Sequence, residues 1–179
     1  MSTDASSANP LVAVTHALEQ DSALDAGVDL LAAAGRAITD RPVVHEILTG
    51  AWLGHSLHPP LTDLPLGAWM SASMLDLLGP EGSEDAATRL VGIGLLGALP
   101  TALSGLADWR SLSKQTDRRV GVVHAVGNSA ALAAYTGSWV ARRKGKHRLG
   151  VLLGLAGAAL SGGAGYLGGH LVAHGTFEG

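Results

Sequence analysis

Residues 149–172, LGVLLGLAGAALSGGAGYLGGHLV, decide the fold because they contain no Asp, Glu, Lys or Arg. The hydrocarbon core of a bilayer is crossed by a helix of about 20 predominantly apolar residues, and this stretch is long enough. A helix on the surface of a soluble protein needs a polar stripe facing water, and this stretch has none. We therefore predict that it spans a membrane.

Three further apolar stretches precede it, separated by short charged connectors, and they cover residues 61–78, 89–107 and 120–141. Four such stretches predict an all-α fold, an antiparallel four-helix transmembrane bundle over residues 54–174. The other interpretation makes them buried helices of a soluble all-α protein. Against it, residues 120–141 also lack any charged side chain from which a water-facing stripe could be built.

The composition of the chain supports a membrane location and excludes several functions. Hydrophobic residues make up 47% of the 179 residues and charged residues 15%, where soluble domains carry about a quarter. The formal net charge of −3 argues against a nucleic-acid partner, because such proteins carry a basic excess. The chain has no cysteine, so it holds no Cys-ligated zinc or iron–sulfur cluster of its own.

The segment before the apolar stretches has a different character. Residues 1–10 are rich in Ser, Ala and Asp, which predicts a disordered N-terminus, and they do not have the pattern of a signal peptide. Residues 11–53 predict an amphipathic, interfacial helical segment, with Ser22 as an N-cap and Pro42 ending the apolar pattern. Its apolar face would lie on a membrane surface or on the protein's own helices. Trp52 is the kind of residue that anchors a chain at the interface.

Small residues recur at four-residue spacing within residues 149–172, in two rows: Gly150, Gly154, Ala158 and Gly162, then Gly157, Ser161, Gly165 and Gly169. Such rows let helix backbones approach closely in lipid, so we predict close packing of this helix. The letters GAGYLG at 163–168 match a dinucleotide-binding fingerprint. They follow no strand, so we interpret them as packing residues too.

Ionisable residues converge on one end of the predicted bundle. In an antiparallel bundle the starts of the first and third helices lie level with the ends of the second and fourth. Ionisable groups within spans usually face the bundle interior. We predict three cofactor-binding histidines there, with three polar residues around them: His58, His124 and His170, then Asp63, Asp108 and Asn128.

The residue types leave the chemistry of this end open. Two imidazoles can hold a b-type haem, and imidazoles with a carboxylate can hold a non-haem metal ion. The same groups could form a proton relay or a quinone pocket. We expect His124 and His170 to face each other, with His58 nearby. The predicted function is a redox-associated membrane subunit binding haem or a metal. The alternative is a structural or partner-binding membrane protein whose polar cluster only fixes helix packing.

A resemblance to a known family rests on motifs at these same helix ends. The motifs are GHSLHPPLTDLPLG at 54–67, GLADW at 105–109 and GGHL at 168–171, together with the single residues Asp76, His124 and Asn128. In these features the chain resembles domain-of-unknown-function family 2231, a family of bacterial four-helix membrane proteins. Members are often fused to a Rieske iron–sulfur domain. The resemblance therefore implies electron transfer, with a separate Rieske or cytochrome protein as partner for this cysteine-free chain.

The location expected from these features is the inner (plasma) membrane of a bacterium, as a multi-pass protein in contact with the lipid bilayer. Lys and Arg are spread nearly evenly over the connectors on the two sides, so the positive-inside rule gives almost a tie. We expect both termini in the cytoplasm, because a long N-terminal segment without a signal peptide is more easily retained than exported.

Overall fold

The computed structural model describes residues 9–174, and this part of the chain is all-α. The disorder predicted for residues 1–10 falls almost wholly outside the described residues. Three short helices come first: α1 (Pro10–Gln20), α2 (Asp25–Thr39) and α3 (Pro42–Thr49), with single 3-10 turns at Ser22–Leu24 and Ala51–Leu53. Four long helices follow: α4 (His58–Leu78), α5 (Glu84–Arg110), α6 (Gln115–Arg143) and α7 (His147–His174).

The long helices begin and end where the sequence supplies the appropriate residues. The α4 helix starts with prolines in its first turn, where the missing N–H costs nothing, and is followed by Gly79. The α5 helix has Glu84 and Asp85 in its first turn and Arg110 in its last, so these charges oppose the helix dipole at both ends. Each of the four predicted apolar stretches lies inside one of these helices.

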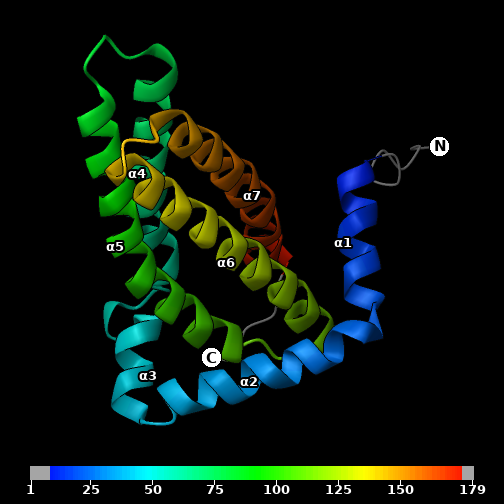
Figure 1. Ribbon diagram of the computed structural model, residues 1–179. Coiled ribbons are helices and arrows are strands. Elements are labelled where there is room, and N and C mark those ends of the chain that lie inside the picture. The colour runs from blue at the N-terminus through cyan, green and yellow to red at the C-terminus, as the bar shows by residue number, and fades with distance from the viewer. Residues whose placement is uncertain (1–8, 175–179) are drawn as a thin grey trace, which may run out of the picture.

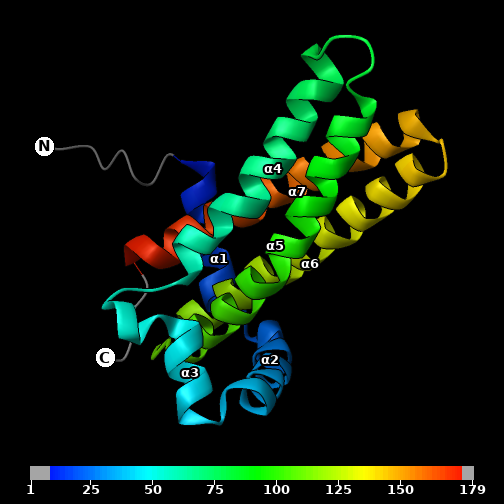
Figure 2. The ribbon, with the colours of Figure 1, turned by 90° about the vertical axis from the view of Figure 1, so that its left-hand side faces the viewer.

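The four long helices form two antiparallel hairpins, α4 with α5 and α6 with α7, which pack against each other mainly through α5 and α6 (Figures 1 and 2). Within the described residues, two helices, α5 and α7, are long and apolar enough to cross a membrane. The α4 helix, which contains Asp63 and Asp76, and the more polar α6 helix do not meet the same requirement. The composition of the helices therefore supports two of the four predicted membrane spans.

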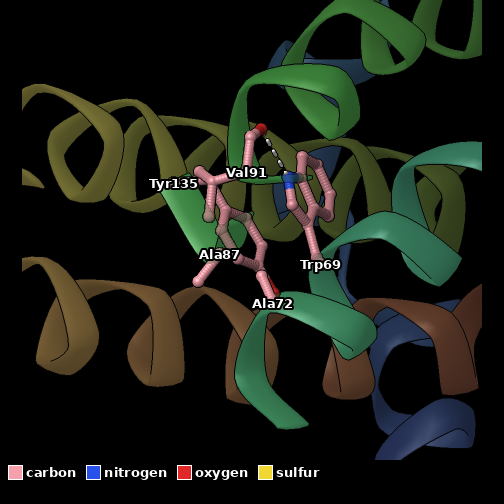
Figure 3. Packing of buried hydrophobic residues seen from close by; sticks show 5 residues of the cluster. All are labelled: Trp69, Ala72, Ala87, Val91 and Tyr135. Atoms are coloured by element: carbon pink, nitrogen blue, oxygen red, sulfur yellow. Dashed lines mark hydrogen bonds between the residues drawn. The ribbon is translucent and has the colours of Figure 1, made fainter. Parts of the chain in front are cut away.

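The main hydrophobic core lies between the hairpins (Figure 3). Trp69 of α4 and Tyr135 of α6 stack with ring centroids 3.9 Å apart and planes 11° from parallel. The Trp69 indole N–H donates to the carbonyl of Val91 on α5 at 3.3 Å. Ala72 and Ala87 pack beside the two rings.

The predicted packing rows on α7 need a correction. The buried residues of α7 are spaced by three or four: Gly150, Gly154, Gly157, Ser161, Ala164 and Leu167. This is the spacing of a helix seam that packs along a nearly parallel neighbour, here α6, whereas a strict four-residue row drifts around the helix. Gly162, Gly165 and Gly169, which we placed in those rows, have no neighbouring heavy atom within 4 Å of an added Cβ.

The N-terminal segment lies across one end of the bundle (Figure 1). We considered a membrane surface and the protein's own helices as the support for the apolar face of this segment. In the structure α2 packs on the protein's own helices, where Val28 contacts Trp109, Leu112 and Val122. The segment is broken at Asp21, between α1 and the turn that leads into α2. This residue is extended and its carboxylate accepts the Ala23 N–H at 3.0 Å.

The predicted N-cap at Ser22 is wrong, whereas the pattern predicted to stop at Pro42 does end before it, at Thr39. Asp21, and not Ser22, caps the turn that leads into α2, because a carboxylate two residues before a free N–H forms this local hydrogen bond readily. Pro42 ends one helical pattern but also begins α3, since proline suits the first turn of a helix.

Candidate functional site

Two of the three predicted histidines, His58 and His124, lie together at one end of the bundle. The Nδ1 of His58, at the start of α4, is 2.9 Å from the carbonyl oxygen of Thr101 on α5. The Nδ1 of His124, on α6, is 2.8 Å from the carbonyl oxygen of Ala164 on α7. A carbonyl oxygen can only accept a hydrogen bond, so each Nδ1 carries the hydrogen and each neutral ring keeps its lone pair on Nε2.

A glycine on the facing helix makes each of these hydrogen bonds possible. A Cβ at Gly105 would lie 2.7 Å from the His58 ring, and a Cβ at Gly168 would lie 2.8 Å from the His124 ring. Both distances are shorter than any real Cβ contact. Each imidazole thus reaches a carbonyl one turn before a glycine because that glycine has no side chain.

The two rings also meet each other. Their centroids are 6.4 Å apart and their planes cross at 83°, an edge-to-face arrangement. His58 belongs to the α4–α5 hairpin and His124 to the α6–α7 hairpin. The contact therefore joins the two hairpins at this end of the bundle.

The same residue spacing recurs along the whole interface between the hairpins. His58 meets His124, Trp69 stacks on Tyr135, and Asp76 pairs with Arg142, and the members of each pair are 66 residues apart in the chain. The glycines repeat as well, because Gly94 faces the Trp69 ring as Gly157 faces the Tyr135 ring.

These equivalences show that α4–α5 and α6–α7 are two versions of one structural unit. The α4 and α6 helices run in the same direction, since their histidines lie at one end and the Asp76–Arg142 pair lies at the other. An approximate two-fold axis therefore runs along the bundle between α4 and α6. His58 and His124 are equivalent residues on either side of it.

At the opposite end the axis is occupied by a buried ion pair. The Asp76 side chain is 4% exposed and the Arg142 side chain 1%. Two guanidinium nitrogens of Arg142 donate to the two carboxylate oxygens, one of them at 2.8 Å. The Arg142 Nε also donates to the hydroxyl of Ser138, which itself donates to the carbonyl of Gly150 on α7 at 2.6 Å. Three helices, α4, α6 and α7, are joined here.

The polar residues predicted beside the histidines differ in their surroundings. Asn128 lies next to His124, and its side-chain N–H donates to the His124 carbonyl at 3.0 Å and lies 3.2 Å from the ring Nε2. Asp108 is half-buried on α5 and accepts a hydrogen bond from the hydroxyl of Ser56. Asp63 is exposed on α4.

His170 does not face His124, contrary to our expectation. Its Nε2 is 2.9 Å from a carboxylate oxygen of Glu19 on α1, and its ring stacks on His174 at 4.9 Å. Each residue of an α-helix is rotated by about 100° from the one before it. Gly168 faces His124, so His170, two residues later, projects from the other side of α7.

The predicted cluster of three histidines is therefore a pair, and the partner of His124 is His58. In the part of the chain that the structure describes, no group of three or more His, Cys, Asp or Glu side chains is arranged to hold a metal ion. The residues that sequence reasoning missed are the two glycines, Gly105 and Gly168, and the ion partner Arg142. The sequence signal that could have found them is the constant residue spacing between equivalent positions of the two hairpins.

The N-terminal segment is tied to this end of the bundle by charged contacts. The Arg119 guanidinium on α6 holds both carboxylate oxygens of Asp25, at 2.7 and 2.9 Å, and Gln115 donates to the same carboxylate at 2.8 Å. The hydrogen bonds from Arg119, and then from Gln115, lower the pKa of Asp25 to about 2. Arg110, at the end of α5, reaches the Thr39 hydroxyl of α2.

Comparison with known proteins adds a family match over the bundle. A family model described as "Predicted membrane protein (DUF2231)" matches residues 54–177. No curated protein and no solved structure matches the chain. The matched range begins at the loop before α4, so it takes in both hairpins and leaves out α1 to α3.

Proposed function

The chain belongs to the DUF2231 family of predicted membrane proteins, and from this we propose that it spans the bilayer four times and binds a metal-centred cofactor between His58 and His124. The cofactor would be a haem or a single metal ion, held near one membrane face. The observation that carries the proposal is the matched pair of imidazoles, each with Nδ1 held by a carbonyl and its lone pair on Nε2. The Asn128 side-chain N–H, 3.2 Å from the His124 Nε2, would turn away when that atom binds the metal.

The outer surface of the bundle supports a membrane location. Large apolar side chains are exposed on all four long helices, among them Met70, Leu77, Leu96, Leu99, Val126 and Leu152. Exposed apolar surface of this extent is costly in water and is matched by lipid chains. Four spans with these connectors would place the histidine pair close to one face and the Asp76–Arg142 pair close to the other.

The geometry of the pair supports a metal ligand role. Metal-binding histidines almost always donate their second ring N–H to a carboxylate, a backbone carbonyl or water, which fixes the ring and its tautomer. The ring centroids are 6.4 Å apart, and a metal held by the Nε2 atoms of both rings would join the two hairpins. Two protein ligands are sufficient for a haem, because the porphyrin supplies the others.

A haem or redox metal here would make the protein an electron-transfer subunit of a bacterial inner membrane, working with a separate Rieske or cytochrome protein. Both termini would lie in the cytoplasm. Transport along the bundle axis is a poorer fit, because stacked Trp69 and Tyr135 fill the centre and the Asp76–Arg142 pair occupies the far end.

A second candidate function is favoured by the same hydrogen bonds. Each histidine ties the two helices of its hairpin together, which is the arrangement expected if the polar cluster only fixes helix packing. The protein would then be a structural or partner-binding membrane protein with no cofactor.

The visible absorption spectrum and metal content of the purified protein separate the two candidates. The protein should be prepared from cells supplied with iron and a haem precursor. We expect a bound haem or about one metal ion per chain, lost in His58→Ala and in His124→Ala. The matched control is His55→Ala, which removes an exposed histidine three residues away whose Nδ1 lies 3.0 Å from the carbonyl oxygen of the adjacent Ser56. His170→Ala should also keep the cofactor.

A colourless, metal-free wild-type preparation would overturn the cofactor proposal and leave the structural candidate. So would a cofactor that survives both histidine substitutions. Circular dichroism and gel filtration of each variant show whether a lost spectrum reflects a lost ligand or a lost fold. Asn128→Ala, next to the Nε2 of His124, should retain the cofactor with a shifted spectrum or potential.

A further inference from the structure

A groove of about 520 Å³ lies between α1 and the α6–α7 hairpin. Leu11, Val14 and Leu18 of α1 form one wall, and Gly162 and Gly163 of α7 lie opposite them. The lining carries no charged side chain. The volume is within the range of about 300–1,000 Å³ that small-molecule sites usually have.

The groove is open because α1 is fastened at its C-terminal end. The Glu19 side chain pairs with His170, and Arg119 donates to the Glu19 carbonyl at 3.0 Å. Nearer the start of α1, Leu11 is 50% and Val14 52% exposed. Opposite them, a Cβ on Gly162 or Gly163 would meet no atom within 4 Å. At these two positions the groove therefore has no side chain to fill it, and the side chains of Val123, Tyr166 and Leu167 complete its lining.

One end of the groove is polar. Leu18 is followed by Glu19, whose two carboxylate oxygens contact His16 at 3.1 Å and His170 at 2.9 Å. His174 stacks on His170. From Leu11 to Leu18 the wall extends about 10 Å along the axis of α1. The groove thus offers an apolar channel that ends at a carboxylate and imidazoles, a pattern that matches a molecule with an apolar chain and a polar head.

We propose that the groove binds one acyl chain of a membrane phospholipid, with the headgroup beyond Leu18, at the end where His174 lies. The inference rests on the proposed membrane location and not on the proposed cofactor. The groove is continuous with the apolar surface of α7, one of the two helices able to cross a membrane. The uncharged lining suits an acyl chain.

Native mass spectrometry of the full chain in mild detergent, titrated with palmitoyl-oleoyl phosphatidylglycerol, tests the proposal. We expect one lipid to bind to the wild type and at least tenfold weaker binding to Gly163→Leu, whose side chain fills the groove. The matched control is Gly169→Leu, at another open glycine of α7 outside the lining, which should bind as the wild type does. A photoreactive acyl chain should label Val14.

Equal lipid binding by the wild type and Gly163→Leu would overturn the proposal. A wild-type dimer that Gly163→Leu converts to a monomer would also overturn it, because the glycine face would then be an interface between copies. The spectrum and metal content of the same samples should be unchanged by Gly163→Leu. A failure of the lipid site is therefore distinguishable from a failure of the histidine site.

Discussion

Asp76→Ala should be among the most destabilising single substitutions in this chain. The change removes the carboxylate that accepts two hydrogen bonds from Arg142. The Arg142 side chain is 1% exposed, so water cannot replace the lost partner. Its remaining polar neighbour is the Ser138 hydroxyl, a single neutral acceptor at 3.2 Å.

The magnitude follows from the burial of both groups. Removing one member of a buried pair costs about 3–5 kcal/mol, because the other charge is left without a partner in a medium of low dielectric constant. An exposed pair is worth about 0–1 kcal/mol, since both charges are well hydrated when separated. Arg110 and Asp40 form such a pair at 3.5 Å, with the Asp40 side chain 66% exposed. Asp40→Ala is therefore the matched control.

The free energy of unfolding of both variants can be measured in bicelles by steric trapping. We expect a loss of about 3–5 kcal/mol for Asp76→Ala and less than about 1 kcal/mol for Asp40→Ala. The double variant Asp76→Leu, Arg142→Leu should recover most of the loss, because it removes both charges together. A loss below about 1 kcal/mol for Asp76→Ala would refute the reasoning, since it would mean that Arg142 is solvated at this position.

Two further predictions test other parts of the structure. Gly94→Ala would place a Cβ 2.2 Å from the Trp69 indole nitrogen and should lower the free energy of unfolding by about 1–3 kcal/mol. The control is Gly67→Ala, whose Cβ would meet no atom within 4 Å and which should leave the free energy of unfolding nearly unchanged. Because the folded-state pKa of Asp25 is lowered to about 2, the contribution of the Asp25–Arg119 pair is present above about pH 4 and is lost as the pH falls through 2. Pepsin cleavage around α2 should accelerate from pH 4 to pH 2 in the wild type relative to Asp25→Asn, and an equal acceleration in both would contradict the assignment.

The helices of the bundle and the family could be read from the sequence, because long uncharged stretches and helix-end motifs are local properties of the chain. The convergence of polar residues on one end followed from antiparallel order alone. It placed His58 and His124 correctly at the same end as Asp108. The partner of His124 could not be read in this way, because it depends on the rotation of α7 about its own axis.

The hydrogen bonds of the two histidines were hidden for a different reason. Their acceptors are the backbone carbonyls of Thr101 and Ala164, and a carbonyl has no residue-specific mark in a sequence. The glycines that admit the rings, Gly105 and Gly168, begin two of the motifs that carry the family resemblance, but nothing in the sequence says that a histidine ring packs against them. The spacing that relates them was obscured because the two halves share few identical residues and have connectors of different length.

Three residue pairs lie along the approximate two-fold axis: His58 with His124, Trp69 with Tyr135, and Asp76 with Arg142. They give a reason for joining the two hairpins in one chain instead of forming a dimer of identical hairpins. In a symmetric dimer each residue on the axis meets its own copy, so a buried Asp76 would face another Asp, or Arg142 another Arg. Two like charges in such a buried position repel strongly, whereas covalently joined halves can diverge to the Asp76–Arg142 pair that the structure contains. The stacked rings have also diverged, to Trp69 and Tyr135. His58 and His124 alone remain identical among these three pairs. Two equivalent imidazoles are what a ligand centred on the axis requires, and fixing helix packing requires no such identity.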